Sequence, residues 1–421
     1  MATDLPANLA FLHDRALDPA RALSAEERAT IAAAREALAG ADVVVVRLGG
    51  MAGRLGECIV ATGLLESLLA ALRLVERAGV PLHLLVDEGA AALFDARLYQ
   101  ERGWPLLRVS AMPPDAGLDL FEVGASEPEG EQVLVFDLHG ANDEMPCIEQ
   151  RAIASGRGAR RITILAHLAR VGLRSYAARG AERRYADFIE ELFGLPPQSI
   201  AGSQAQPRIL LSESDIARSP QLARSLGLDP TALLVVCFFQ SVVVAKCYER
   251  WDEVMAQACQ RFATAQPSLR LNFLLACGPD EQQPLGFAQS DLAEWLGDFT
   301  GVRDNARVTL AMLPSLRDLA IVLTRATLAL ANDTGPGHLA GALGIPTITP
   351  YLPGDLYSRR VWASSLFHHG VTPDPNPFTH QQLEAAVLWD RTDIINSIPP
   401  EDLVGPAVAR ILAAARSLWP Q

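Results

Sequence analysis

A glycine-rich turn in the last third of the sequence carries residues that can bind a phosphate. The small and apolar run 328–331 ends at Asn332 and Asp333, and Thr334-Gly335-Pro336-Gly337 leads into the helical run 338–343. The start of a helix presents unpaired backbone N–H groups and the positive end of the helix dipole, and both attract phosphate. Glycine lets the backbone approach a ligand, and proline fits a first helical turn, where no N–H donor is needed. The plainer alternative is that Asp333 or Thr334 only caps a short core helix.

The same turn belongs to a predicted βαβ unit. Gly344 is placed to end the helix, Pro346 follows as a helix breaker, and 347–351 is a second apolar strand. In such a unit the helix begins on the side where the parallel strands end. The turn would therefore face any ligand bound at that edge of the sheet.

A longer segment around this turn resembles a known family. Residues 315–346 read SLRDLAIVLTRATLALANDTGPGHLAGALGIP and resemble the signature of family-nine glycosyltransferases, the ADP-heptose:lipopolysaccharide heptosyltransferases. The resemblance implies a GT-B fold, with two doubly wound, Rossmann-like α/β domains facing a cleft. It also implies that the turn binds a nucleotide-sugar donor, with the sugar on Asp333 and the diphosphate on Thr334, Gly335 and His338; Gly337 belongs to the same donor-binding turn.

The resemblance assigns two further residues of the second half. Lys246, in QSVVVAKCYERW, matches the family's lysine before a tryptophan, although the family has K-x-W and Trp251 stands five residues on. We expect Lys246 to contact the diphosphate and to assist catalysis, and the alternative is a surface lysine. Glu281, in GPDE, matches an acidic residue near the adenosine ribose, and the alternative is a simple turn acid.

A second glycine-rich loop follows the first predicted strand. The β-branched run 42–48 is typical of a buried parallel strand, and the loop 49–56 leads into a helix at 58–78. The glycine spacing matches a dinucleotide-binding turn poorly, and the Gly-Lys-Ser/Thr of a P-loop is absent.

Here the family has R-L-x-x-x-G-D, in which the Asp is the proposed catalytic base. This chain has Arg47-Leu48, a longer loop, and Glu57 at the position of that Asp. Glu57 is therefore the expected catalytic base. If the base lies elsewhere in the first half, Asp137, Asp143 and Glu144 are the next candidates.

Nine arginines lie between residues 151 and 184, against the single acid Glu182. The usual explanation of such a charge run is a solvated helical face. In an otherwise acidic chain, recognition of an anionic acceptor is the alternative. The acceptor-side candidates are Arg157, Arg160, Arg161 and Arg174.

The composition is that of a globular protein with an acidic balance. Hydrophobic residues make up 49%, charged residues 20%, and the net charge is −13. This charge argues against nucleic acid and against broad adhesion to an anionic membrane, although a local basic patch leaves a peripheral membrane contact open. No apolar run reaches the roughly 18 to 20 residues of a transmembrane segment, and MATDLP lacks the features of a signal peptide. We expect a cytoplasmic protein.

Neither a metal nor a cofactor is expected. The sequence has no Asp-x-Asp motif, its six cysteines lack metal-ligand spacing, and His368-His369 is an isolated pair. The start of the helix after Thr334, together with Lys246, would then stabilise a departing diphosphate. The nucleotide sugar would be a substrate rather than a cofactor.

Strand and helix patterns repeat in the two halves and predict two α/β domains. We expect an N-terminal extension with a helix at 1–40, an acceptor-side domain at 41–200 and a donor-binding domain at 208–398. A C-terminal helix, 399–421, would return to the first domain or lie on the surface. The stretch 195–207 is the expected linker, and residues 1–23 are expected to be a loose arm or an oligomer contact.

These features predict an inverting, metal-independent glycosyltransferase, most like a heptosyltransferase of lipopolysaccharide biosynthesis that uses ADP-heptose. The acceptor hydroxyl would belong to a glycolipid, a protein or a small molecule. One rival is a GT-B nucleotide-sugar epimerase, which needs no acceptor. A second rival is an inactive donor-binding subunit, suggested by Glu57 in a lengthened loop.

Overall fold

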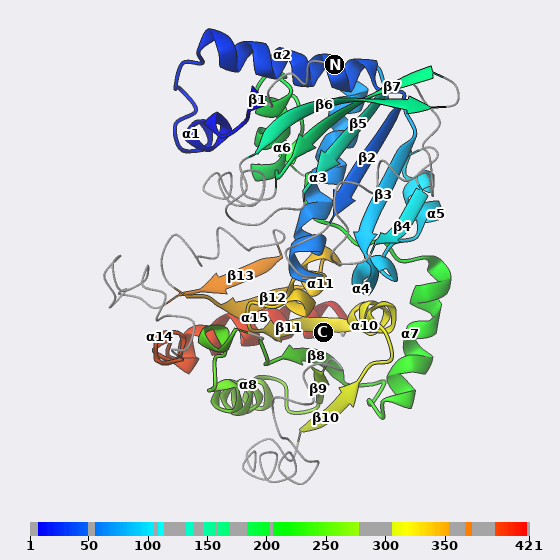
Figure 1. Cartoon of the computed structure of the whole chain (residues 1–421). Coiled ribbons are helices and arrows are strands. Elements are labelled where there is room, and N and C mark those ends of the chain that lie inside the picture. Colours follow the sequence, from blue (N-terminus) through cyan, green and yellow to red (C-terminus); the bar gives the residue numbers. More distant parts are fainter. Residues whose placement is uncertain are drawn as a thin grey trace. The chain divides into compact units, whose positions relative to one another are not determined.

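The computed structural model describes residues 7–48, 55–104, 108–112, 132–138, 146–155, 158–168, 183–202, 205–241, 243–277, 305–352, 367–372 and 392–418 (Figure 1). Contacts divide the chain into two compact units, Met1–Leu210 and Leu211–Gln421. Each unit contains one sheet of mainly parallel strands with helices packed on it. The prediction of two α/β domains is confirmed.

The first unit has a seven-stranded sheet in the order β1-β6-β7-β5-β2-β3-β4. Its strands are β1 (Ala7–Asn8), β2 (Val43–Leu48), β3 (Leu82–Asp87), β4 (Arg108–Met112), β5 (Gln132–Asp137), β6 (Cys147–Ser155) and β7 (Gly158–Ala166). The strands from β7 to β4 are parallel, whereas β6 and β1 are antiparallel additions at one edge. Every residue of β2 is buried, as its β-branched sequence predicts for a central parallel strand.

The helices of the first unit include α1 (Phe11–Leu17), α2 (Ala25–Gly40), α3 (Leu55–Leu74), the short α4 (Glu88–Ala91) and α5 (Ala96–Glu101), and α6 (Arg184–Leu192). Helix α6 contacts α1, α2 and α3. Helix α2 starts with a capping box: the Glu27 N–H donates to Ser24 Oγ over 3.1 Å, and the Ser24 N–H donates to Glu27 Oε2 over 2.7 Å.

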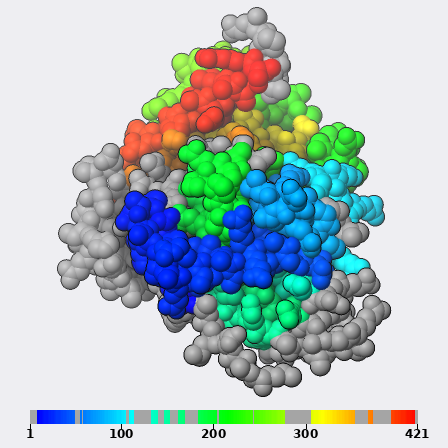
Figure 2. Space-filling model, turned by 90° about the horizontal axis from the view of Figure 1, so that it is seen from above, coloured from blue at the N-terminus to red at the C-terminus, as the bar shows by residue number. Residues whose placement is uncertain are grey.

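Residues 7–17 are an integral part of the first unit, so the expectation of a loose arm is wrong for them. Strand β1 pairs with β6, and the Leu9 N–H donates to Pro146 O over 2.8 Å. Leu9 and Leu12 are fully buried, and α1 contacts α6. In Figure 2 this dark blue N-terminal part lies on the surface of its unit. It covers the start of β6, at Cys147 and Ile148, where that strand would otherwise form a sheet edge.

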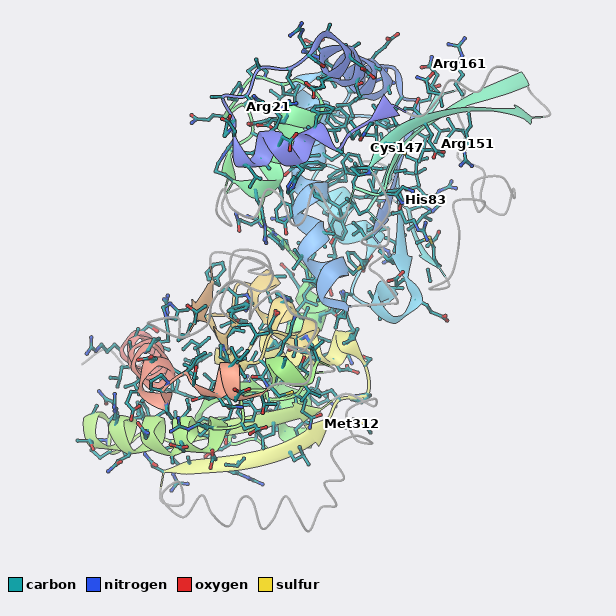
Figure 3. The ribbon with its side chains drawn as sticks, turned by 60° about the vertical axis from the view of Figure 1, so that its left-hand side comes forward. Arg21, His83, Cys147, Arg151, Arg161 and Met312 are labelled. Atoms are coloured by element: carbon teal, nitrogen blue, oxygen red, sulfur yellow. The ribbon has the colours of Figure 1, made fainter. Side chains whose placement is uncertain are left out.

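The arginine-rich stretch begins as a β-hairpin and not as a helical face. Strands β6 and β7 pair antiparallel from Cys147 opposite Ala166 to Ser155 opposite Gly158. Figure 3 shows Arg151 and Arg161 on this hairpin. From Arg161 to Ile164, more exposed residues of β7 alternate with buried ones, which is the period of a strand. Charge density alone does not distinguish this arrangement from a helix.

The stretch 195–207, expected as a linker, is packed into the first unit where the structure describes it. Ile200 and Ala205 are fully buried. The Glu190 carboxylate accepts from the N–H groups of Gln198 and Ile200 over 2.9 and 2.7 Å. These hydrogen bonds make the segment part of the first unit, although its composition, rich in Pro, Gly and Ser, is typical of a linker.

The second unit has a six-stranded, fully parallel sheet in the order β10-β9-β8-β11-β12-β13. Its strands are β8 (Leu233–Phe238), β9 (Leu271–Cys277), β10 (Ala306–Met312), β11 (Ala326–Ala331), β12 (Thr347–Pro350) and β13 (His368–Val371). Counted along the chain, the order is 3-2-1-4-5-6, which is that of doubly wound nucleotide-binding sheets.

The helices described in the second unit include α7 (Glu213–Ser225), the 3-10 turn η6 (Val244–Lys246), α8 (Trp251–Ala265), α10 (Leu316–Leu323), α11 (Gly335–Ala342), α14 (Asp393–Asn396) and α15 (Pro400–Leu418). Helix α15 packs on α8, and its buried residues Leu403, Val404, Ala407 and Ile411 belong to the core of this unit. Within the described residues, no helix has both the length and the apolar character needed to cross a membrane.

Candidate functional site

The strand order of the second sheet reverses between β8 and β11, and the predicted phosphate-binding turn begins there. The two strands are direct parallel neighbours, with Phe238 opposite Ala331 at their carboxyl ends. The chain leaves β8 towards η6, which ends at Lys246, and leaves β11 through Asn332 and Asp333. In doubly wound sheets the ligand crevice lies at the carboxyl ends of the strands where the order reverses. Topology therefore brings Lys246 and Asp333 to a ligand-binding position.

Asp333 is the centre of a buried group of three side chains, which we call the Asp333 triad. Lys246 Nζ lies 2.5 Å from Asp333 Oδ2, and His338 Nε2 lies 3.2 Å from Asp333 Oδ1. The side chains of Asp333 and His338 are 4% and 5% exposed, and that of Lys246 is 14% exposed. Each carboxylate oxygen thus has its own partner, and Lys246 is the most accessible member of the triad.

The Asp333 triad keeps its carboxyl group ionised. Burial would raise the pKa of Asp333, because a carboxylate loses its hydration in the interior. The Lys246 ammonium and the His338 hydrogen bond outweigh this effect and hold the pKa of Asp333 well below its usual range. A carboxylate neutralised in this way repels a nearby phosphate far less than a bare one would.

The backbone that leads into α11 is shaped by its glycines. Helix α11 begins at Gly335, three residues earlier than expected, with Thr334 as its N-cap and Pro336 in the first turn. The Gly337 N–H donates to Thr334 Oγ1 over 3.4 Å. A Cβ atom on Gly337 would lie 2.9 Å from the Cβ of Ala331, so this position admits only glycine without a shift of the helix away from β11.

His338 has one bound and one unbound ring nitrogen. Its Nε2 is bound by Asp333, whereas its buried Nδ1 has no hydrogen-bond partner within the described residues. Since a carboxylate only accepts, Nε2 carries a hydrogen and donates it to Asp333. The ring of His368 lies 5.5 Å from that of His338, and its Nε2 is 3.0 Å from Thr349 Oγ1.

Asn332, whose partners cannot be read from the sequence, connects the strand ends to the Lys246 segment. Its Oδ1 accepts from the Tyr248 N–H over 3.2 Å and from Trp251 Nε1 over 3.1 Å. Its Nδ2 donates to Phe239 O over 2.6 Å. The residue is fully buried, and its amide oxygen and nitrogen are both bound. Asn332 thus fixes the geometry between β8, β11 and the start of α8.

A second asparagine holds the same segment from the other side. Asn396 Oδ1 accepts from the Glu249 N–H over 2.7 Å, and Asn396 Nδ2 donates to Cys247 O over 3.3 Å. The Tyr248 hydroxyl donates to Ile398 O over 3.0 Å. The backbone next to Lys246 is therefore bound on two sides, which restrains the position from which the ammonium extends.

Composition also singles out Lys246. The sequence has 36 basic residues of the Lys and Arg types, and Lys246 is the only lysine among them. An ammonium is a compact charge with three rotatable donors, whereas a guanidinium is a planar fork. A lysine suits a position where the cation exchanges between two anionic partners, here the Asp333 carboxylate and a bound diphosphate. This compositional signal was readable from the sequence, but the expectation for Lys246 was based on the resemblance.

The first unit has a comparable ion pair where its own strand order reverses, between β2 and β5. Arg47 and Asp137 are direct cross-strand neighbours, with Arg47 Nη1 3.8 Å from Asp137 Oδ1, and the side chains are 3% and 1% exposed. Glu57 lies in the first turn of α3, and its side chain is outside the described part of the structure. Asp137 is thus occupied by Arg47, which makes it a poor substitute for Glu57 as a base.

Two of the four acceptor-side candidates lie on β7, and the other two lie outside the described residues. Arg161 is exposed on β7, and Arg160 lies on the same strand with its side chain undescribed. Arg157, Arg174 and the donor-side Glu281 are outside the described residues, as are Asp143 and Glu144. Two other arginines of the run have structural partners. Arg183 forms ion pairs with Asp187 and Glu190, and Arg184 is fully buried above the ring of Tyr185.

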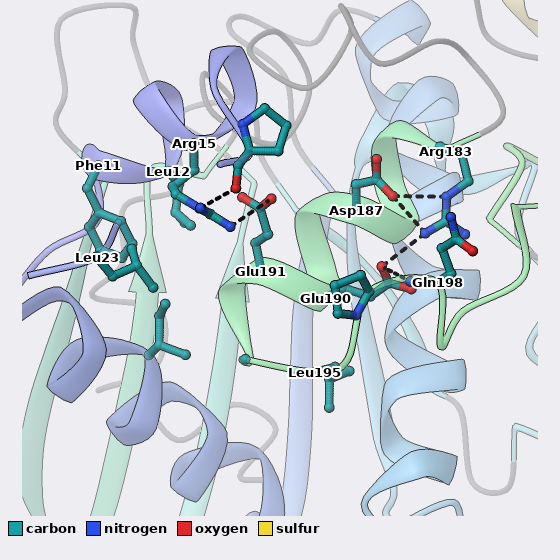
Figure 4. A pocket seen from close by; sticks show the side chains of 14 residues that line it. Phe11, Leu12, Arg15, Leu23, Arg183, Asp187, Glu190, Glu191, Leu195 and Gln198 are labelled. Carbon is teal, nitrogen blue, oxygen red and sulfur yellow. Dashed lines mark hydrogen bonds and ion pairs between the residues drawn. The ribbon is translucent and has the colours of Figure 1, made fainter. Parts of the chain in front are cut away.

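A pocket of about 560 Å³ lies in the first unit beside α1, α2 and α6 (Figure 4). Its apolar lining includes Phe11, Leu12 and Leu195. Its charged groups are paired within the protein: Arg15 lies 3.7 Å from Glu191, and Arg183 binds Asp187 and Glu190. None of the predicted site residues lines this pocket. We assign it to the packing of the N-terminal helices on α6.

Over the residues that the structure describes, no three His, Cys, Asp or Glu side chains are grouped so as to hold a metal ion. The cation of the Asp333 triad is Lys246, a side chain of the chain itself. An ammonium and the free N–H groups at the start of a helix are both groups that bind phosphates in proteins.

Comparison with known proteins supports this interpretation. Residues 176–382 match the profile of glycosyltransferase family 9 (heptosyltransferase), and this range contains Lys246 and the Asp333 turn. No curated protein matches the sequence. The crystal structure of the glycosyl transferase family 9 from Veillonella parvula DSM 2008 is similar at a TM-score of 0.58 and 16% identity, covering 88% of this chain and 97% of that one. This likeness shows the fold, which is GT-B.

Two solved structures from E. coli are more distant. ADP-heptose lps heptosyltransferase II has 14% identity and a TM-score of 0.46, with 89% of this chain and 99% of that one covered. Heptosyltransferase WaaC with ADP has 14% identity and the same TM-score, with 88% and 99% covered. Scores this low add no support beyond the family match. The match itself confirms the resemblance over residues 176–382, and the chain is a glycosyltransferase, heptosyltransferase-like.

Proposed function

We propose that the chain transfers a sugar from a nucleoside diphosphate sugar, in the first place ADP-heptose, to a hydroxyl group, with inversion and without a metal ion. The observation that carries the proposal is the Asp333 triad beside the start of α11, at the reversal of strand order. It supplies the two elements that a departing diphosphate needs, a cation and a set of backbone donors. ADP-heptose is chosen because segment 315–346 resembles the signature of the ADP-heptose transferases.

The reaction follows from these groups as a single displacement. The acceptor oxygen forms a bond to the anomeric carbon while the bond from that carbon to the diphosphate oxygen breaks. The diphosphate leaves with the bonding electron pair and is stabilised by Lys246 and the N–H groups of α11. A base removes the proton of the acceptor hydroxyl, and Glu57 is our candidate for it.

The identity of the donor is tested first by binding. Calorimetric titration with ADP, UDP and GDP, each with and without EDTA, should show that ADP binds tightest and that EDTA has no effect. Preferential binding of UDP or GDP would refute the ADP assignment, and loss of binding in EDTA would refute the metal-free one.

Product analysis then tests transfer. Incubation with ADP-heptose and a lipopolysaccharide-core acceptor should give ADP and a product with the opposite anomeric configuration. Glu57→Gln should lower turnover about 10²- to 10⁴-fold with little change in ADP affinity, as expected on removal of a general base. Release of ADP or free nucleotide without any glycosylated product would favour the epimerase instead.

A further inference from the structure

The charges of the Asp333 triad change when a diphosphate arrives. In the structure, Asp333 is balanced by Lys246 on one oxygen and hydrogen-bonded by His338 on the other. Lys246 is the most exposed of the three, so an incoming diphosphate reaches its ammonium first. As the ammonium moves towards the phosphate oxygens, the buried carboxylate loses its compensating charge. An uncompensated carboxylate in the interior is strongly unfavourable.

His338 is placed to restore the balance. Its Nε2 already faces Asp333, and its Nδ1 has no hydrogen-bond partner within the described residues. A proton added at Nδ1 turns the ring into an imidazolium that donates through both nitrogens. The Nε2–H remains on Asp333, and the new Nδ1–H needs an acceptor, which diphosphate oxygens can supply.

We propose that binding of a nucleoside diphosphate at the start of α11 is coupled to the uptake of one proton from solvent by His338, which converts its contact with Asp333 into an imidazolium–carboxylate pair. The proposal rests on the proposed function, because it requires a diphosphate at this site. It adds a regulatory property: the affinity for the donor falls as the pH rises.

The surroundings of His338 limit where else the proton can go. The titratable or charged groups shown in contact with its ring or with its partner are Asp333 after β11, Lys246 on η6 and His368 on β13. Asp333 is held ionised by its two partners. Lys246 is the cationic partner in the ion pair with Asp333. His368, with its ring 5.5 Å from that of His338, is the remaining competitor and serves as the matched control.

Titration calorimetry of the full chain with ADP tests the proposal. At about pH 8 the phosphates of ADP are fully ionised, so proton exchange reports on the protein. The apparent binding enthalpy is measured in buffers that differ in ionisation enthalpy, and the slope gives the number of protons taken up. For the wild type we expect uptake approaching one proton, and an affinity that falls by up to tenfold per pH unit.

The variants assign the proton to one ring. His338→Gln keeps an amide donor for Asp333 but cannot take up a proton, so uptake should vanish and the affinity should become nearly independent of pH. His368→Gln should retain the uptake. Two outcomes would overturn the proposal even if His338→Gln failed to fold. One is loss of proton uptake in His368→Gln alone, and the other is binding of ADP by the wild type without proton uptake. Failure of ADP to bind the wild type at all would instead refute the proposed function, and the proton linkage with it.

Discussion

The charges of Lys246 and Asp333 compensate each other and are largely shielded from solvent. Their atoms are 2.5 Å apart, and the carboxylate is almost fully buried. Removing one partner of a buried pair leaves the other charge without compensation, at a cost of about 3–5 kcal/mol. Lys246 is therefore expected to contribute both to the stability of the fold and to the binding of the diphosphate.

Lys246→Met should accordingly lower both properties. Loss of a charge-assisted contact worth roughly 1.5–3 kcal/mol predicts a fall in ADP affinity of about 10- to 100-fold, and the Tm should also decrease. Calorimetry with ADP and a thermal scan measure the two effects. The control is Arg250→Met, which removes an exposed ion pair with Glu253 a few residues away and should change neither property appreciably. Equal effects of the two substitutions would argue against a special role for Lys246.

Asp333 gives a pH signature of its own. Because the folded state holds the pKa of Asp333 below its unfolded value, ionised Asp333 adds stability that is fully present above the unfolded pKa of about 4 and is lost as the pH falls towards the folded pKa. The difference in unfolding free energy between wild type and Asp333→Asn should thus be constant from about pH 5 to pH 7 and shrink below about pH 4. Urea titrations at several pH values measure it. A difference that grows with acid would show the opposite sign of linkage.

At the residue scale, sequence reasoning succeeded where the pattern was local. The strand, turn and helix around Asp333 follow from neighbouring residues, so they could be placed from the sequence alone. The role of Asn332 could not, because its partners Tyr248 and Trp251 come from a distant segment and meet it only when β8 and β11 pair. The pairing of Asp137 with Arg47 is equally non-local.

Among the elements, α11 depends on its close approach to the end of β11. Gly337→Ala would place a Cβ 2.9 Å from that of Ala331 and should push the helix outwards. We expect a loss of about 1–3 kcal/mol in the free energy of unfolding, with weaker ADP binding, because the N–H groups of α11 move with the helix.

A matched control for this substitution lies in α15. A Cβ on Gly405 would meet no atom within 4 Å, so Gly405→Ala should stabilise the protein by roughly 0.5–1 kcal/mol through helix propensity alone. Urea unfolding of both variants measures the contrast. If Gly337→Ala proved as harmless as Gly405→Ala, the close approach would not constrain this position.

Elements with a clear residue pattern could be predicted from the sequence. The buried run of β2 and the capping box of α2 follow from residue type and spacing. The β6–β7 hairpin was missed because its arginines obscured the alternation. The linker expected at 195–207 failed for a related reason: its backbone is bound by Glu190, a residue on α6.

At the scale of the whole molecule, each unit has a core of its own. Ile411 on α15 is buried in the core of the second unit, and Leu192 on α6 is buried in the first. Truncating either side chain to alanine should cost about 2–5 kcal/mol. In differential scanning calorimetry we expect Ile411→Ala to lower the Tm of one transition, and Leu192→Ala that of another, by several degrees, roughly 5 °C or more.

ADP identifies which transition belongs to which unit. Because the Asp333 triad lies entirely in the second unit, ADP should raise only the transition that Ile411→Ala lowers. A single transition shifted alike by both substitutions would mean that the units unfold together. The division of the chain into two α/β halves was readable from the repeated patterns, whereas the boundary after Leu210 depends on contacts that no local pattern encodes.

Because Lys246 is the only lysine of the sequence, its side chain can be followed selectively by labelling. Growth on isotope-labelled lysine would place the label at one position of the sequence, beside Asp333. A single ammonium resonance would then follow the exchange of this cation between carboxylate and diphosphate directly, with no assignment problem. The same uniqueness lets an amine-selective reagent act as a footprint of the site, since protection of one peptide would measure occupancy.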